Sequence, residues 1–193
     1  MKMTRTKVAA AALLACLLLA GLTLSATTLN LAKSQTAKRE NGIKLRLSGR
    51  RVVVRERGGS HALDIWKHVE AAKIDDAREI FLTRGGGFVY LLLDVCGPSK
   101  AKPDEHECGA GEECNLIWLK LDEAWRERDA KSVRYDSCWS PIVSYDGLKV
   151  SGRTLSLEYD DLRDNTQHEL TYDADKPEAG LKDESKPLPK DNP

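Results

Sequence analysis

The chain has 193 residues, of which 30 are basic and 30 are acidic, and this length suits one domain rather than two. Without the first 26 residues the balance is 27 basic to 30 acidic residues. A protein that binds nucleic acid needs a basic excess on one face, so this balance argues against a nucleic-acid partner.

The N-terminus has the order of a secretory signal. Lys2, Arg5 and Lys7 precede an unbroken apolar run over residues 8–22, and Thr23-Leu24-Ser25-Ala26 follows. A basic segment, an apolar run and small residues in this order predict a signal peptide over residues 1–26 and export to the periplasm or the medium. The run is shorter than the roughly 20 residues of a membrane-spanning helix. An uncleaved signal that anchors the chain remains the alternative.

A polar tether over residues 27–42 is expected to lead into a β-rich domain over residues 43–173. Ile43, Leu45 and Leu47 alternate with polar residues, as in a half-buried strand, and three valines at 52–54 suggest its hairpin partner. Spaced apolar residues over 62–78 predict one short helix. The ranges 79–83, 115–121, 132–139, 148–159 and 167–172 are predicted to contain further strands.

The most apolar stretch after the signal is Phe88 to Val95. Because glycines bound it, it is predicted to be a central strand buried on both faces. The predicted fold is all-β, or β-rich α+β: an antiparallel meander that forms a sandwich or small barrel. Residues 174–193 are rich in Lys, Asp, Glu and Pro, which predicts a disordered tail.

Four cysteines remain after the signal, namely Cys96, Cys108, Cys114 and Cys138. An even number in an exported domain predicts two disulfides. On consecutive antiparallel strands Cys96, Cys114 and Cys138 reach one edge of the sheet. We therefore favour the pairs Cys96–Cys114 and Cys108–Cys138, with Cys108–Cys114 and Cys96–Cys138 as the alternative.

Candidate interaction residues gather around the loop 97–113, whose length suggests a working element. His106 and Glu107 lie in this loop, and Trp125 and Trp139 are expected near strand ends at the cysteine edge. Two Ser-Gly-Arg turns present Arg50 and Arg153. The expected partner is a protein or a cell-envelope glycan.

No catalytic motif stands out in the sequence. It has no C-x-x-C zinc pair, no calcium loop, no G-x-S-x-G turn and no phosphate-binding glycine loop. We therefore expect no catalytic residue, metal or cofactor. The predicted function is that of an exported, non-enzymatic binding domain, and the alternative is a periplasmic inhibitor of an exogenous hydrolase such as lysozyme.

Overall fold

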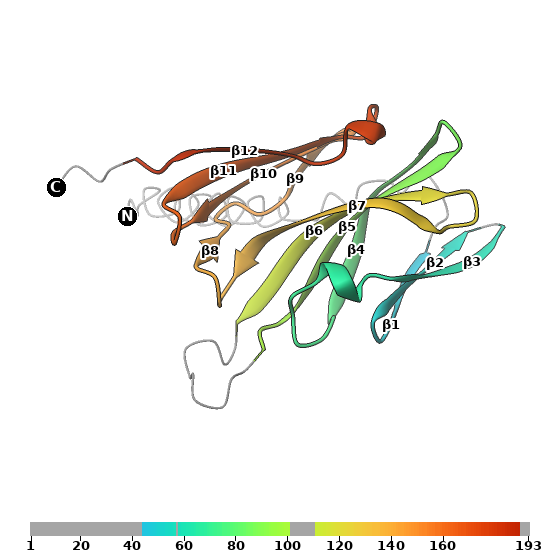
Figure 1. Ribbon diagram of the computed structural model, residues 1–193, viewed down its shortest axis with the longest axis horizontal. Coiled ribbons are helices and arrows are strands. Elements are labelled where there is room, and N and C mark those ends of the chain that lie inside the picture. Colours follow the sequence, from blue (N-terminus) through green and yellow to red (C-terminus); the bar gives the residue numbers. More distant parts are fainter. Residues whose placement is uncertain (1–43, 57, 101–110, 190–193) are drawn as a thin grey trace, which may run out of the picture. The chain divides into compact units, whose positions relative to one another are not determined.

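A computed structural model describes residues 44–56, 58–100 and 111–189, which belong to one unit, Asn41–Pro193. The smaller of its two sheets has the order β1 (Lys44–Ser48), β2 (Arg51–Glu56), β3 (Gly59–Asp64) (Figure 1). The larger has the order β12-β11-β10-β8-β7-β6-β5-β4, with β9 paired to β10. Its strands are β4 (Asp76–Gly85), β5 (Phe88–Pro98), β6 (Glu112–Asp122), β7 (Glu127–Ser137), β8 (Ile142–Val143), β9 (Lys149–Ser151), β10 (Thr154–Asp161), β11 (Thr166–Asp173) and β12 (Lys182–Pro187).

All pairings are antiparallel, and neighbours in each sheet follow one another along the chain apart from β9. The predicted β-rich antiparallel meander is therefore confirmed. The predicted helix over 62–78 is wrong. Leu63 belongs to β3, and only a short 3-10 turn, η1 (Trp66–His68), follows it.

The hairpin of β5 and β6 is the central layer of the fold. Val89, Leu91 and Leu93 point into one core, whereas Leu92 points into the other, and all four side chains are buried. The predicted burial of this strand on both faces is therefore confirmed. Alternate side chains of β6 divide between the two cores in the same way, with Leu119 in the first and Trp118 in the second.

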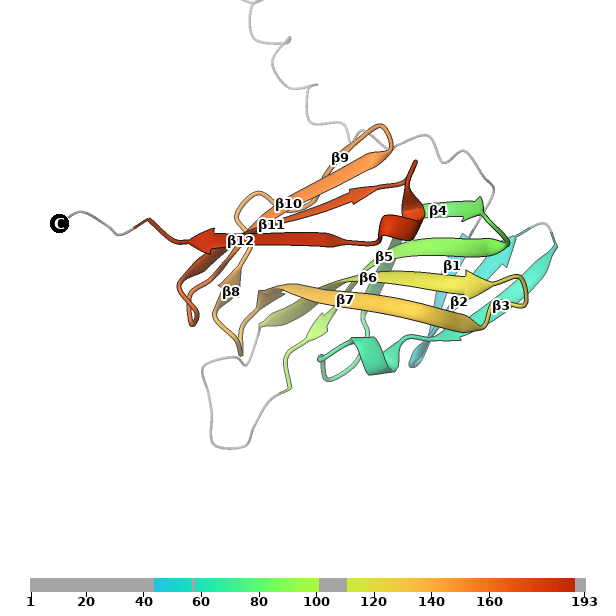
Figure 2. The same cartoon turned by 45° about the horizontal axis from the view of Figure 1, so that its top comes forward.

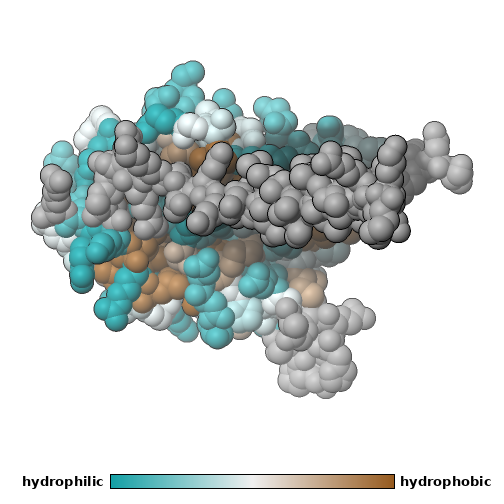
Figure 3. Space-filling view, turned by 180° about the vertical axis from the view of Figure 1, so that it is seen from behind, coloured by the Kyte–Doolittle hydropathy of each residue, from teal (hydrophilic) through white to brown (hydrophobic). Residues whose placement is uncertain are grey.

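Each outer layer closes one of these cores. Val52, Val54 and Leu63 of the smaller sheet cover the first core. Leu157 of β10 and Leu170 of β11 cover the second, so the larger sheet folds back over its own β5–β6 hairpin. Hydrophobic residues also show at the surface, among hydrophilic ones, when the molecule is seen from behind (Figure 3).

The segment after residue 173 is part of the fold, and the predicted disordered tail is wrong as far as residue 189. Ala174 and Leu181 are buried in the second core, and the 3-10 turn η2 (Pro177–Ala179) accepts a hydrogen bond from the Trp118 indole through the Pro177 carbonyl at 3.0 Å. Strand β12 then pairs with β11 along its whole length (Figure 2). Residues 190–193 lie outside the described part.

The structure contains the predicted disulfide between Cys96 and Cys114, which face each other on β5 and β6. The second predicted bridge involves Cys108, which lies outside the described residues, so Cys108–Cys138 stays a prediction. Cys138 is next to Gly111, where a Cβ would stand 2.7 Å from the Cys138 sulfur. This places Cys138 beside the point where the chain returns from the loop.

The predicted signal and tether, residues 1–42, also lie outside the described residues. Within the described ranges no helix combines the length and the hydropathy that a membrane-spanning helix needs.

Candidate functional site

The structure separates the residues that the sequence grouped at the cysteine edge. Trp139 does lie there, since its backbone N–H points at Glu113 at 3.4 Å. Trp125 does not, because β6 carries the chain away from Cys114 and Trp125 follows its far end. The expectation for Trp125 is therefore wrong. His106 and Glu107 lie outside the described residues.

A buried carboxylate organises the cysteine end. Glu113 is fully buried, and its two oxygens accept hydrogen bonds from the Ser99 hydroxyl at 2.7 Å and the Ser137 hydroxyl at 2.6 Å. The Arg134 guanidinium lies 3.7 Å away and also pairs with Glu70 at 2.7 Å. Ser99 donates its backbone N–H to the Gly111 carbonyl at 2.9 Å. This network fixes both ends of the loop 99–111.

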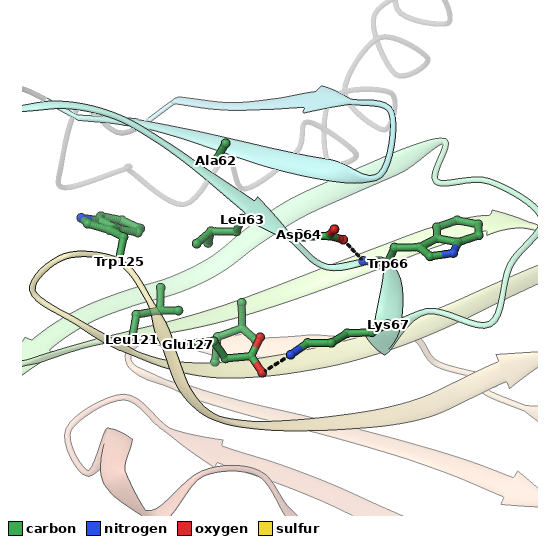
Figure 4. A pocket seen from close by; sticks show the side chains of 9 residues that line it. Ala62, Leu63, Asp64, Trp66, Lys67, Leu121, Trp125 and Glu127 are labelled. Carbon is green, nitrogen blue, oxygen red and sulfur yellow. Dashed lines mark hydrogen bonds and ion pairs between the residues drawn. The ribbon is translucent and has the colours of Figure 1, made fainter.

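At the other end of the hairpin a cleft of about 400 Å³ lies between the two sheets. Trp66 and Trp125 stand at its two ends, and the Lys67–Glu127 pair lies along one wall (Figure 4). The remaining lining residues are Ala62, Leu63, Asp64, Leu119 and Leu121. The cleft therefore combines apolar side chains with a few charged groups, and its volume is in the usual range for ligand sites.

Trp125 is held in a backbone conformation that tryptophan rarely adopts. Its φ is +60°, and its N–H donates to the Asp122 carbonyl at 2.9 Å, which closes the turn between β6 and β7. This left-handed position in a short hairpin loop usually holds glycine. Here the indole is 7 % exposed and packs on the first core, so burial offsets the backbone strain.

A histidine and two arginines cover the faces of the two tryptophans. The His61 ring stacks on Trp125 with ring centroids 4.3 Å apart, and the Arg84 guanidinium lies 5.6 Å from the same indole. At the other end of the cleft, the Arg50 guanidinium lies 4.8 Å from the Trp66 ring. The structure thus brings Arg50 and Trp125, two of the predicted residues, to the same cleft.

The polar wall is a charge cluster centred on Glu127. Lys67 Nζ lies 2.7 Å from Glu127 Oε1, and His68 Nε2 lies 3.1 Å from Oε2. Burial raises the pKa of the Glu127 carboxyl, but the hydrogen bonds from Lys67 and His68 outweigh burial and lower it overall. Glu127 is therefore ionised at neutral pH and holds Lys67 against the cleft.

Arg153, the remaining predicted arginine, is distant in sequence from the cleft residues, and its side chain is engaged by neighbouring residues of the same domain. Its guanidinium pairs with Asp175 and donates to the Ala174 carbonyl at 2.6 Å. These contacts hold it against the segment that leads to β12.

A second polar group on β11 has an arrangement known from hydrolases. The Thr166 hydroxyl lies 3.0 Å from His168 Nε2, and His168 Nδ1 lies 2.9 Å from Asp183. A triad also needs donors for an oxyanion and a site for the reacting atom. A small pocket of about 150 Å³ lies beside His168, but Thr166 is not among the residues that line it. His168 also stacks on Tyr159, so we interpret this network as the connection between β10, β11 and β12. In the described residues no three His, Cys, Asp or Glu side chains gather as a metal would require.

Sequence reasoning missed Trp66, Lys67 and Glu127. Trp66 and Lys67 fell within the predicted helix, and the strand containing Glu127 was expected to begin only at residue 132. The turn after Asp122 was the sequence signal that could have located this end of the cleft. A strand that begins at the cysteines and ends at Asp122 places Trp125 in the turn at the opposite end.

Comparison with known proteins finds no match among family models, curated proteins or solved structures.

Proposed function

We propose that the protein is an exported, non-enzymatic binding domain that holds an extended segment of a protein partner in the cleft between Trp66 and Trp125. One observation carries the proposal. Ala62, Leu63 and Asp64 are consecutive residues of β3, and all three line the cleft. Side chains of a strand alternate between its faces, so three in a row line a cleft only when it runs along the edge of the strand.

This edge is open in the described structure. β3 is the last strand of its sheet and pairs only with β2. An open edge offers unpaired backbone N–H and C=O groups, and an extended peptide can add to it as a further strand. Backbone pairing supplies affinity in this mode, and the pockets beside the strand supply specificity.

The floor and wall of the cleft suit an anchor side chain of such a peptide. Leu63, Leu119 and Leu121 form an apolar floor, onto which an aromatic or large aliphatic side chain would pack. Lys67 is 62 % exposed although it is paired, so it can contact polar groups beside the anchor. Buried anchors with a polar rim carry most of the affinity in protein interfaces.

A protein ligand suits this cleft better than a glycan. A sugar ring stacks on an open aromatic face, but His61 already covers one face of Trp125. Export is supported by the Cys96–Cys114 disulfide, since such bonds persist in oxidising compartments. The inhibitor alternative gains no support, because Arg153 is engaged by Asp175 and Ala174.

Peptide display against the full chain tests the proposal. We expect selection to enrich peptides that alternate polar and apolar residues around one large apolar anchor. Trp66→Ala should weaken binding of an enriched peptide at least tenfold, and Lys67→Glu should weaken it less. Tyr145→Ala is the matched aromatic control, because Tyr145 is 71 % exposed and does not line the cleft.

Two results would contradict the proposal. One is enrichment of peptides whose affinity is the same for wild type, Trp66→Ala and Tyr145→Ala. The other is failure of the selection while an array of cell-envelope glycans binds in a Trp66-dependent manner, which would assign the cleft to a sugar.

A further inference from the structure

The outward face of the smaller sheet is strongly basic. Leu45, Leu47, Val52, Val54 and Leu63 point toward the first core, so the alternate residues point away from it. The exposed outward positions include four basic residues, Lys44, Arg46, Arg51 and Arg55, and one acidic residue, Asp64. We call the four basic residues the basic face.

The basic face keeps a net positive charge within the described structure, since only Arg51 has an acidic residue, Asp64, opposite it in the strand register. None of the four makes an ion pair or a side-chain hydrogen bond to another described residue. Lys44 stands directly opposite Arg55 in the register of β1 and β2. Like charges directly opposite each other destabilise a sheet, so this arrangement suits an external anionic partner.

The balanced charge of the whole chain conceals this segregation. Residues 27–57 contain nine basic and two acidic residues, whereas residues 58–193 contain 18 basic and 28 acidic residues. The basic part begins after the apolar run 8–22, and the chain enters the described domain at Lys44, on the basic face itself.

From these observations we propose that the basic face docks the domain on an anionic phospholipid surface. Clusters of four to eight basic residues bind anionic membranes, each contributing about 1 kcal/mol near the surface. The four charges lie on one face of a short three-stranded sheet, so they can approach a layer of head groups together. Lys33, Lys38 and Arg39 precede it in sequence and add to the basic charge of this part of the chain.

Vesicle co-sedimentation of the full chain tests this docking. The probes are vesicles of phosphatidylcholine alone and vesicles with 30 % phosphatidylglycerol. Any contribution of the apolar N-terminal run is common to all variants, so the difference between the two vesicles reports the charge effect. We expect wild type to prefer the anionic vesicles, and the preference to fall as salt rises and shortens the screening length.

The deciding variant is Arg46→Glu/Arg55→Glu, which changes only exposed outward side chains. It should lower the bound-to-free ratio on anionic vesicles roughly tenfold or more. Lys182→Glu/Lys186→Glu is the matched control, since it makes the same change of charge at exposed positions of β12. It should retain most of the preference. Circular dichroism of both variants checks that the fold is intact.

Three results would overturn the proposal: equal binding of wild type to both vesicles, equal loss in the two variants, or no loss in Arg46→Glu/Arg55→Glu. Sedimentation in the absence of lipid, and binding to single-stranded DNA, identify the other occupants. Association of the chain with itself or with DNA that depends on Arg46 and Arg55, without a preference among vesicles, would assign the face to that partner instead. None of these results depends on the cleft.

Discussion

The His61 and Trp125 rings lie almost parallel, with an interplanar angle of 7° and centroids 4.3 Å apart, and this stack joins the two sheets beside the cleft. His61 is on β3, and Trp125 follows β6. His61 Nε2 is also 3.4 Å from Glu56, which in turn pairs with Arg84. The end of the cleft is therefore a connected group rather than a single side chain.

The left-handed backbone of Trp125 predicts an unusual order of stabilities. Trp125→Ala removes the buried indole and should lower the free energy of unfolding by about 3–5 kcal/mol. Trp125→Gly removes the same indole but relieves the strain at φ +60°, so it should be more stable than Trp125→Ala by roughly 1 kcal/mol. Urea unfolding of both variants measures this order. Alanine equal to or more stable than glycine would mean that the turn is not strained.

The environment of Asp122 predicts that the stability of the fold depends on pH in the acid range. The backbone N–H of Arg126, at 2.9 Å, is the largest influence on this carboxyl, and the side chains of Arg126 and Arg128 add to it. Together they lower the pKa from 3.8 to about 2. A carboxyl whose pKa is lowered by folding stabilises the folded state at pH values above its ordinary pKa. This stabilisation is lost as the pH falls through the pKa of the folded state.

Wild type should therefore lose its advantage over Asp122→Asn between about pH 4 and pH 2. The asparagine oxygen can still accept the Arg126 N–H, so the turn is kept and the comparison isolates the charge. Urea midpoints at pH 5, 4, 3 and 2 give the measurement. A difference between the two proteins that stays constant over this range would contradict the cause given for the pKa.

The Glu113 network predicts that the cysteine end of the β5–β6 hairpin is destabilised when the carboxylate is removed. Glu113→Ala leaves the Ser99 and Ser137 hydroxyls and the Arg134 guanidinium without this acceptor, and should cost about 3 kcal/mol or more of stability. Glu113→Gln keeps an acceptor and should cost less. Hydrogen exchange at the Ser99 amide, which bonds Gly111, should accelerate in Glu113→Ala. An unchanged rate at Ser99 would show that the network does not hold the loop ends.

The Cys96–Cys114 bridge closes a sequence separation of 18 residues. In the loop-entropy model a bridge of this span stabilises by about 3 kcal/mol. Cys96→Ala/Cys114→Ala should therefore lower the unfolding free energy by about that amount. Peptide mapping of the wild-type protein without reduction should recover Cys96 and Cys114 in one linked fragment. Free thiols at both positions in protein taken from the cell would contradict this bond.

Much of the fold was predictable because its burial pattern is strong. The run at 88–95 is apolar on both faces, and both faces are covered in the structure. Leu63, Trp66 and Val69 recur at helical spacing, but Leu63 is an inward residue of β3, Trp66 begins the 3-10 turn η1 and Val69 follows that turn. Spacing alone could not distinguish these cases, because three apolar residues over a strand and a short turn mimic a helical stripe.

The last strand was missed for a different reason. All six residues of β12 are exposed, so the composition has no apolar signal. Backbone pairing with β11 orders the strand, and Leu181 and Ala174 bury their side chains before it. The cleft was missed because it depends on β3 being the unpaired edge strand of the smaller sheet. Strand order in a sheet is a tertiary property.

Site-directed photocrosslinking in cells that make the protein tests the central claim most directly. A photoreactive phenylalanine analogue replaces Ala62, which is exposed at the open edge of β3 and lines the cleft, or replaces Val150, which is 46 % exposed on β9 outside the cleft lining. We predict a discrete protein adduct at position 62 that disappears with Trp66→Ala and is absent at position 150. No adduct at position 62, or the same adduct at both positions, would contradict the claim that this cleft binds a protein partner.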